Sequence, residues 1–257
     1  MSDAILQADA VWKMVQRNRD VYLKTWKTNF LPPLLEPLLY LLSLGYGLGR
    51  LVPELDGMSY AQFIAPGILA ITMMQSAFFD TTYGSYVRMF FQKTWDAVTA
   101  TPLSLNDVLV GEMVWAAIKA TINTALVALV VAAFGLLPWA MLPLLLPVAF
   151  AVGLLFGGIG MLFTAKVPHI DSFSFAIYLL ITPMMLFAGT FFPLDQLPDV
   201  VQRAAQVLPL THAVLVTRPI VLGDPAAVPW QSAAYLLVAA LGLPILAVQW
   251  MRRKLIV

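Results

Sequence analysis

Six long apolar stretches alternate with short polar connections along the chain. A helix that crosses the hydrocarbon core of a bilayer needs about 20 mainly apolar residues, and each stretch provides about that length. The stretches cover residues 30–50, 61–83, 108–134, 139–165, 173–193 and 230–250. The pattern therefore predicts an all-α, polytopic membrane protein with six transmembrane helices.

A different pattern precedes the first apolar stretch. Charged side chains recur there at helical spacing and share one face, namely Lys13, Arg17, Asp20, Lys24 and Lys27. Apolar side chains fall on another face, namely Val11, Val15, Tyr22 and Trp26. Residues 1–28 are therefore expected to form an amphipathic helix in the membrane interface, with its basic face toward lipid head groups. A simple topology anchor and a docking surface for a cytoplasmic partner both fit this pattern.

The region after the fifth apolar stretch, residues 194–228, predicts a third kind of element. Its first part has a polar helical face, made by Asp199, Gln202, Arg203 and Gln206. Pro198 suits the first turn of this short helix and Pro209 is expected to stop it. Residues 210–222 are apolar but too short to cross the bilayer and return. The region is expected to be a re-entrant helical hairpin on the outer side, the alternative being an amphipathic helix resting on the outer leaflet.

Composition supports one membrane domain over residues 1–257, with spans one to five in 30–193 and span six in 230–250. The chain is 60% hydrophobic and only 11% charged, whereas soluble domains carry about a quarter charged residues. It has no cysteine, which excludes disulfides and thiolate metal sites. Its net charge of +1 gives no general attraction for nucleic acid. The basic amphipathic start before the first apolar run argues against a cleaved signal peptide.

Orientation follows from the lysine and arginine side chains of the short loops. If the N-terminus is cytoplasmic, eleven of these side chains lie on the cytoplasmic side: Lys13, Arg17, Arg19, Lys24, Lys27, Arg88, Lys93, Lys166, Arg252, Arg253 and Lys254. Three lie on the outer side: Arg50, Arg203 and Arg218. Both termini are therefore expected in the cytoplasm.

Four ionisable residues fall inside predicted spans: Glu36, Asp80, Glu112 and Lys119. Such groups are costly in the bilayer and usually face a bundle interior or an aqueous cavity. Glu112 and Lys119 are separated by about 10 Å along their helix, so each is expected to meet a group on another helix. Asp80 and Glu36 are the available acids. Asp80 and Glu112 lie near the span ends and favour structural pairing, whereas Glu36 and Lys119 lie deeper and suit a translocation path or a subunit seam.

Aromatic residues in or near the spans offer surface to sugars or lipids, among them Tyr40 and Phe78. For any single one of them, a place in the core, against lipid or in an interfacial belt is the commoner explanation. We place Tyr40 and Phe78 with Glu36 and Lys119 in the candidate translocation path.

Enzyme and metal motifs are missing. The chain has no GxxxxGK[ST] motif for ATP and no HExxH motif. His169 and His212, its two histidines, are expected on opposite sides of the membrane and so cannot share a metal. No cofactor or metal is therefore expected on this chain. A proton-coupled secondary transporter using Glu36, Asp80 or Glu112, and an intramembrane lipid-acting enzyme using His212 or Asp171, remain as alternatives.

The cytoplasmic connection at residues 88–107 is longer than a turn requires. Its sequence, RMFFQKTWDAVTATPLSLND, predicts a short helix with Trp95 on its apolar side and Lys93 and Asp96 exposed. Thr101 and Pro102 are expected to end this helix. Ser104 or Asn106 can cap the helix that follows. A loop of this kind suits contact with a soluble partner.

Three motifs in this order resemble the permease subunit of type-2 ATP-binding-cassette exporters, nearest the branch of nodulation-factor (lipo-chitooligosaccharide) exporter permeases. The first is YAQFIAPG at residues 60–67, similar to the family's Y-x-x-F-[IVL]-x-P-G. The second is TATPLS at residues 99–104. The third runs from GTFFP at residues 189–193 to LPLT at residues 208–211. The resemblance covers the whole chain.

The resemblance implies a homodimer of six-span subunits in the bacterial inner membrane, driven by two copies of a cytoplasmic P-loop ATPase. ATP and Mg would bind that partner, and an amphipathic substrate such as a lipo-oligosaccharide, a polysaccharide or a drug-like molecule would leave toward the outside. Eight residues would form the ATPase-coupling surface: Lys93, Thr94, Trp95, Asp96, Thr101, Pro102, Lys13 and Arg17. Four would form the outer gate: Phe191, Phe192, Pro193 and Arg203.

Overall fold

A computed structural model of the chain describes residues 7–52, 54–55 and 57–255. Within them the regular structure is helical, and no β-strand occurs. Six helical segments are long and apolar enough to cross a membrane: Leu31–Arg50, Tyr60–Phe91, Leu105–Ala133, Trp139–Lys166, Ile170–Phe187 and Trp230–Leu255. The predicted all-α fold with six spans is confirmed.

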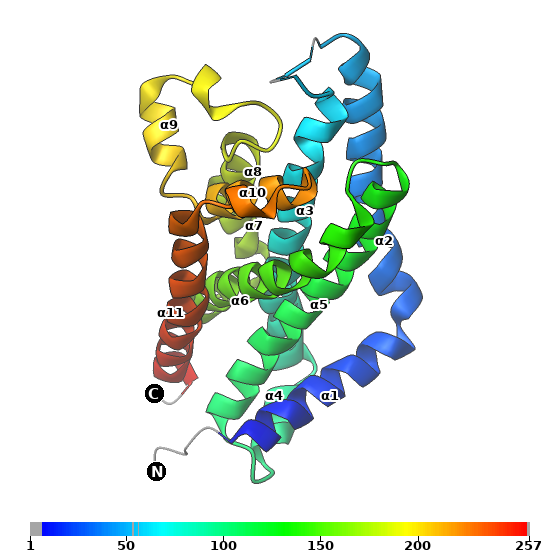
Figure 1. The fold of residues 1–257 in the computed structure, drawn as a ribbon. Coiled ribbons are helices and arrows are strands. Elements are labelled where there is room, and N and C mark those ends of the chain that lie inside the picture. Colours follow the sequence, from blue (N-terminus) through cyan, green and yellow to red (C-terminus); the bar gives the residue numbers. More distant parts are fainter. Residues whose placement is uncertain (1–6, 53, 56, 256–257) are drawn as a thin grey trace.

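Helix α1 (Ala8–Lys24) lies obliquely across one end of the bundle and packs against α5 (Leu105–Ala133) (Figure 1). The contact is close at Met14, because a Cβ atom added to Gly111 of α5 would lie 2.5 Å from the Met14 Cβ. The side chains of α1 that are buried are Ala10, Met14, Val15, Asn18 and Tyr22. The predicted apolar face is thus partly wrong: Trp26 is 53% exposed, and the polar Asn18 is buried, because α1 packs on a protein helix and not only on lipid.

The first span, Leu31–Arg50, consists of most of α2 (Trp26–Tyr40), a π-helical segment (Leu41–Gly47) and a 3-10 turn (Leu48–Arg50). It contains Pro32, Pro33 and Pro37 within the helix. Proline lacks the N–H that the helical hydrogen bond needs, so each of them leaves a carbonyl of the preceding turn without its usual donor. The side of this span that faces away from the bundle is largely exposed; Leu31, for example, is 56% exposed.

The second span is longer than the hydropathy pattern predicts. Helix α3 (Tyr60–Phe79) continues through two π-helical segments, Asp80–Gly84 and Val87–Phe91, so the span reaches residue 91 instead of 83. Ser59 begins α3 with a capping box that includes Gln62. The short helix α4 (Thr94–Thr99) follows, and Ser104 then caps α5 (Leu105–Ala133), as one of the two predicted caps.

Spans three, four and six are α5, α6 (Leu142–Lys166) and α11 (Trp230–Leu255). Small residues bring them together. A Cβ atom added to Gly153 of α6 would lie 2.8 Å from the Ala117 Cα of α5. A Cβ atom added to Gly158 would lie 2.9 Å from the Pro244 backbone nitrogen of α11. Such close approach of backbones is the usual way in which membrane helices pack.

The fifth span consists of α7 (Phe173–Ala176), a π-helical segment (Ile177–Ile181) and α8 (Thr182–Phe187). It ends earlier than predicted because Gly189 takes a left-handed conformation, with φ of 76°. Beyond it, α9 (Asp199–Ala205) and α10 (Pro209–Val221) form a helix pair bent by 83°. Helix α9 stops at Ala205, so Pro209 starts α10 and does not end α9, which corrects the prediction.

The two helices of the α9–α10 hairpin differ in their position and burial. Helix α9 projects from the end of the bundle opposite α1 and α4, whereas α10 lies across the bundle beside α3 (Figure 1). Most of α10 is buried, including Leu210, Ala213 and Val221. Helix α10 is therefore an internal element, and α9 is the exposed one, with Val200 79% exposed.

Candidate functional site

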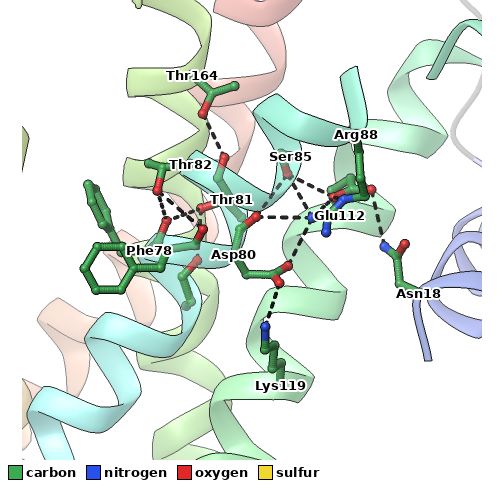
Figure 2. Close-up of polar contacts among 12 residues, drawn as sticks. Asn18, Phe78, Asp80, Thr81, Thr82, Ser85, Arg88, Glu112, Lys119 and Thr164 are labelled. Carbon is green, nitrogen blue, oxygen red and sulfur yellow. Dashed lines mark hydrogen bonds and ion pairs between the residues drawn. The ribbon is translucent and has the colours of Figure 1, made fainter. Parts of the chain in front are cut away.

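Two carboxylates and two cations meet inside the bundle, where α3 continues into its π-helical segments (Figure 2). Lys119 Nζ donates to Asp80 Oδ1 at 3.0 Å, and Arg88 Nη2 donates to Asp80 Oδ2 at 3.2 Å. Arg88 also pairs with Glu112, with its Nε 2.8 Å from Glu112 Oε2. Asp80 and Glu112 are buried. The four formal charges cancel, so we call Asp80, Arg88, Glu112 and Lys119 the buried quartet.

The pairing of Lys119 with Asp80 agrees with the prediction, but the partner of Glu112 was missed. The sequence pattern places Arg88 in the cytoplasmic connection, because the second apolar stretch is predicted to end at residue 83. The structure keeps residues 80–91 helical instead. The spacing of Asp80, Gly84 and Arg88 at four-residue steps is the signal that indicates a helical face here.

The π-helical segment Asp80–Gly84 shapes the quartet. Its backbone is held by a neighbouring span, since Thr164 Oγ1 of α6 donates to the Thr81 carbonyl at 2.8 Å (Figure 2). Ser85 Oγ donates to Glu112 Oε2 at 2.9 Å. Gly84 leaves room for the guanidinium, because an added Cβ atom would lie 3.2 Å from Arg88 Nη1. π-Helical turns of this kind occur frequently at functional sites.

A line of hydrogen bonds connects the quartet to α4 through α1. Asn18 Nδ2 donates to Glu112 Oε1 at 3.3 Å, and Arg17 Nη1 donates to Asn18 Oδ1 at 2.9 Å. Arg17 Nη2 also donates to Thr94 Oγ1 at 3.3 Å. Burial lowers the pKa of Arg17, while the Glu112 carboxylate acts in the opposite direction. The other predicted coupling residue of α1, Lys13, is exposed and is not part of this line.

The predicted coupling surface is helical at α4, and its members differ in exposure. Lys93 and Asp96 are exposed, with Lys93 Nζ 3.9 Å from Asp96 Oδ2. Lys93 has a left-handed φ of 53°, which non-glycine residues adopt rarely. Thr101 and Pro102 are exposed in the turn that follows. Trp95 is only 3% exposed, so its expected contact with a partner is corrected: its side chain anchors α4 to the bundle.

A pocket of about 380 Å³ opens beside the quartet, between α2, α3 and α5. It brings together Glu36 and Lys119, two of the four residues predicted for the translocation path. Asp80, Asn123 and Phe79 also line it. A second pocket, of about 370 Å³, lies toward α1 and shares Asp80 and Lys119 with the first. The ion pair between these two residues therefore stands between the two pockets.

The other two residues predicted for the path lie elsewhere. Phe78 is completely buried and packs edge-on against Phe163, with ring centroids 6.1 Å apart, so it belongs to the core of the bundle. The neighbouring Phe79, and not Phe78, lines the pocket. Tyr40 lies nearer the opposite end, where its ring centroid is 6.0 Å from that of Phe191.

The four residues predicted for the outer gate also lie in two separate places. Phe191, Phe192 and Pro193 are half-buried in the segment between α8 and α9. Tyr60 Oη donates to the Phe191 carbonyl at 2.9 Å. Arg203 is exposed on α9. The first three thus lie in one loop that is tied to the start of α3, whereas Arg203 stands on the projecting helix.

Comparison with known proteins decides the family. Residues 9–222 match the family model described as ABC-2 type transporter. The chain belongs to the ABC-2 type transporter family. It is 44% identical to nodulation protein J of Rhizobium leguminosarum bv. trifolii, over 84% of this chain and 81% of the relative. It is 39% identical to nodulation protein J of Rhizobium meliloti over the same shares, and 22% identical to the inner membrane transport permease YadH of Escherichia coli, over 75% of each chain.

This ABC-2 chain is therefore the membrane-spanning permease component of an ABC exporter, with several apolar helices that cross a membrane. Two of the motifs that carry the resemblance contact each other in the permease. Gly67 of the first motif lies against Thr190 of the third, since an added Cβ atom would lie 2.7 Å from the Thr190 carbonyl oxygen. Arg218 of α10 donates to the Gly189 carbonyl at 2.8 Å and stacks on Phe63, 4.1 Å from its ring centroid.

Proposed function

We propose that the permease exports an amphipathic, lipid-linked saccharide across the bacterial inner membrane. In this proposal it acts as a homodimer with two copies of a cytoplasmic P-loop ATPase, which bind ATP and Mg, and both of its termini are cytoplasmic. The similarity to nodulation protein J and to an inner membrane transport permease supports the class of protein. The excess of basic side chains at the end that holds α1 and α4 supports the orientation.

The observation that carries the proposal is the hydrogen-bonded line from α4 to the pocket. It runs from Thr94 through Arg17 and Asn18 to Glu112, and from there through the buried quartet to Lys119 on the pocket wall. Buried charges and hydrogen bonds of this kind have few alternative partners, so a displacement at one end strains the whole line. A nucleotide-driven movement of the partner at α4 would thus reach the pocket.

The surface that meets the ATPase is the exposed part of α4 and its turn, with Lys93, Asp96, Thr101 and Pro102, together with Lys13 of α1. Trp95 holds this surface in place from the buried side. The path begins at the pocket with Glu36 and Lys119 and ends at the half-buried segment of Phe191 to Pro193. Arg203 on α9 would then stand at the rim of the exit.

A proton-coupled transporter using Glu36, Asp80 or Glu112 is the alternative, and the ion pairs weigh against a carrier role for Asp80 and Glu112. Asp80 and Glu112 are each paired with a cation. Use of either carboxylate as a proton carrier would require its buried ion pair to break in each cycle, which leaves a buried cation without its partner. An export assay in proteoliposomes separates the two: ATP drives the exporter without a proton gradient, and the gradient alone drives the alternative.

The main test is the recovery of the ATPase. The tagged permease, solubilised gently from its native host, is expected to co-purify with a P-loop ATPase at one copy per permease. Asp96→Ala, on the exposed face of α4, is expected to weaken this complex, with Lys24→Ala on the exposed face of α1 as the matched control. A folded permease that recovers no ATPase under conditions that preserve membrane complexes would contradict the proposal.

The connecting line has its own test. Thr94→Val removes the hydroxyl that accepts from Arg17 and leaves the size of the side chain nearly unchanged. The ATPase is expected to bind this variant normally, but ATP hydrolysis and export are expected to lose their coupling. If export per ATP hydrolysed is unchanged, the line does not transmit the movement.

A further inference from the structure

The pocket between α2, α3 and α5 contains a buried polar atom that has no partner in the described part of the chain. Asn123 lies on the pocket wall and is 1% exposed. Its Nδ2 donates to Ser76 Oγ at 2.9 Å, but its Oδ1 accepts no hydrogen bond. A buried acceptor without a donor destabilises the protein. A ligand that brings a donor to this atom is therefore favoured.

Helix α2 adds acceptors on the facing wall. Pro37 has no N–H, so the Pro33 carbonyl cannot make its α-helical hydrogen bond, and both prolines line the pocket. The Glu36 carboxylate lies between them in the sequence and also lines the pocket. Gln75 of α3 contributes an amide, which both donates and accepts.

The charges of the pocket disfavour an anionic ligand. Lys119 is the cation on its wall, and it is already paired with Asp80 at 3.0 Å. Glu36 adds a negative charge, so a phosphate or carboxylate head would meet repulsion without a free cation to offset it. Hydroxyl groups both donate and accept hydrogen bonds, which matches the mixed wall. The Phe79 ring supplies an apolar surface of the kind that the C–H face of a sugar ring contacts.

The surroundings of the pocket suit a molecule with a hydrocarbon part. Helix α2, which forms one wall, exposes Leu31, Leu35 and Leu39 at 56%, 45% and 64%. These side chains face outward from the bundle and suit contact with lipid chains. The pocket volume of about 380 Å³ lies in the range of about 300–1,000 Å³ that is usual for small-molecule sites. It accommodates a compact head group and leaves a long chain outside.

We infer that this pocket binds the uncharged, hydroxyl-rich head of an amphipathic molecule, whose hydrocarbon part stays in the lipid beside α2. Asn123 Oδ1 accepts from a hydroxyl of the head, Gln75 adds a second polar contact, and the ion pair of Lys119 with Asp80 forms the polar floor. The inference rests on the proposed export of an amphipathic substrate and assigns the place where its head binds.

The test uses the full permease in lipid discs and calorimetric titration with two probes that share a dodecyl chain. Dodecyl maltoside, below its micelle-forming concentration, carries a neutral sugar head, and dodecyl phosphate carries an anionic one. Empty discs give the background of partition into lipid. Dodecyl maltoside is expected to bind the permease saturably, and dodecyl phosphate is expected to give only the background.

Variants locate the site. Asn123→Leu is expected to weaken dodecyl maltoside binding about five- to tenfold, as the loss of one hydrogen bond predicts. Thr124→Val is the matched control, because Thr124 is a buried neighbour on α5 that does not line the pocket. It is expected to change binding less than about twofold. Gln75→Leu is the second variant and covers the case in which Asn123→Leu does not fold.

Unchanged binding in folded Asn123→Leu and Gln75→Leu, or equal binding of both probes, would overturn the inference. The outcome is separable from that of the export proposal, because binding needs no ATPase. If the ATPase co-purifies and the sugar head does not bind, the site alone is wrong. If the sugar head binds and no ATPase is recovered, the exporter proposal is wrong.

Discussion

The structure predicts that the stability of the permease depends on the net charge of the buried quartet. Glu112→Gln keeps the shape of the side chain but removes one of two negative charges, and leaves Arg88 and Lys119 to share Asp80. Glu112 is fully buried, so water does not replace the lost charge. Removal of one partner of a buried ion pair typically costs about 3–5 kcal/mol. We expect Glu112→Gln to lower the free energy of unfolding by about that amount.

A second substitution tests whether net charge is the cause. Lys119→Met removes the excess positive charge, and Asp80 can then pair with Arg88 alone at its present 3.2 Å. Glu112 and Lys119 do not contact each other, so independent effects would simply add. We expect the double variant Glu112→Gln, Lys119→Met to be more stable than that sum by about 0.5–3 kcal/mol.

The assay is reversible unfolding in mixed micelles by increasing mole fraction of sodium dodecyl sulfate, followed by tryptophan fluorescence. Trp115 is buried and lines the second pocket together with Arg88 and Lys119, so its fluorescence reports on the environment of the quartet. Asp20→Asn is the surface control: its pair with Arg19 is more than half exposed and is expected to contribute less than about 0.5 kcal/mol. A cost below about 1 kcal/mol for Glu112→Gln, or strict additivity in the double variant, would refute the reasoning.

Three further predictions concern glycines; the first two use the same unfolding assay, and the third uses hydrogen exchange. Gly67→Ala is expected to lower the free energy of unfolding by about 1–3 kcal/mol, because the added Cβ atom would lie 2.7 Å from the Thr190 carbonyl oxygen and the backbone has to move. An unchanged unfolding midpoint would show that the third motif is loosely held. Gly242→Ala, in α11 with open space around it, is expected to stabilise the helix by up to about 1 kcal/mol, and a loss of stability would indicate a contact that the structure does not contain. Gly111→Ala is expected to push Met14 away and loosen α1, seen as faster hydrogen exchange in α1 but not in α11; equal exchange in both helices would contradict this.

The sequence pattern predicts the spans well because hydrophobic length is a strong signal. It fails at residues 84–91, where the helix continues although Gly84, Ser85 and Arg88 interrupt the apolar run. The side chains of Arg88 and Ser85 are bound by Glu112 of α5, and such long-range pairing leaves no mark in a local hydropathy pattern. For the same reason the pattern identifies Asp80 as a partner for Lys119 but not Arg88 as the partner of Glu112.

Exposure within a short helix is also hard to predict from sequence. The composition of α4 predicts a surface helix with Trp95 on the apolar side, and the structure shows that this side is fully covered. Phe78 and Phe79 are adjacent aromatic residues in one span, and only their direction around the helix decides which one lines the pocket. That direction is set by how α3 packs on α5 and α6, which the sequence alone does not specify.

The π-helical segments of the second span also constrain how this chain tolerates insertions and deletions. A single-residue change of length shifts the direction of every later side chain around an α-helix by about 100°. Deletion of one residue within 80–84 would leave the hydropathy of the span almost unchanged and would turn Arg88 away from Glu112. Relatives that keep the quartet are therefore expected to keep the number of residues between Asp80 and Arg88, even where the residues themselves differ.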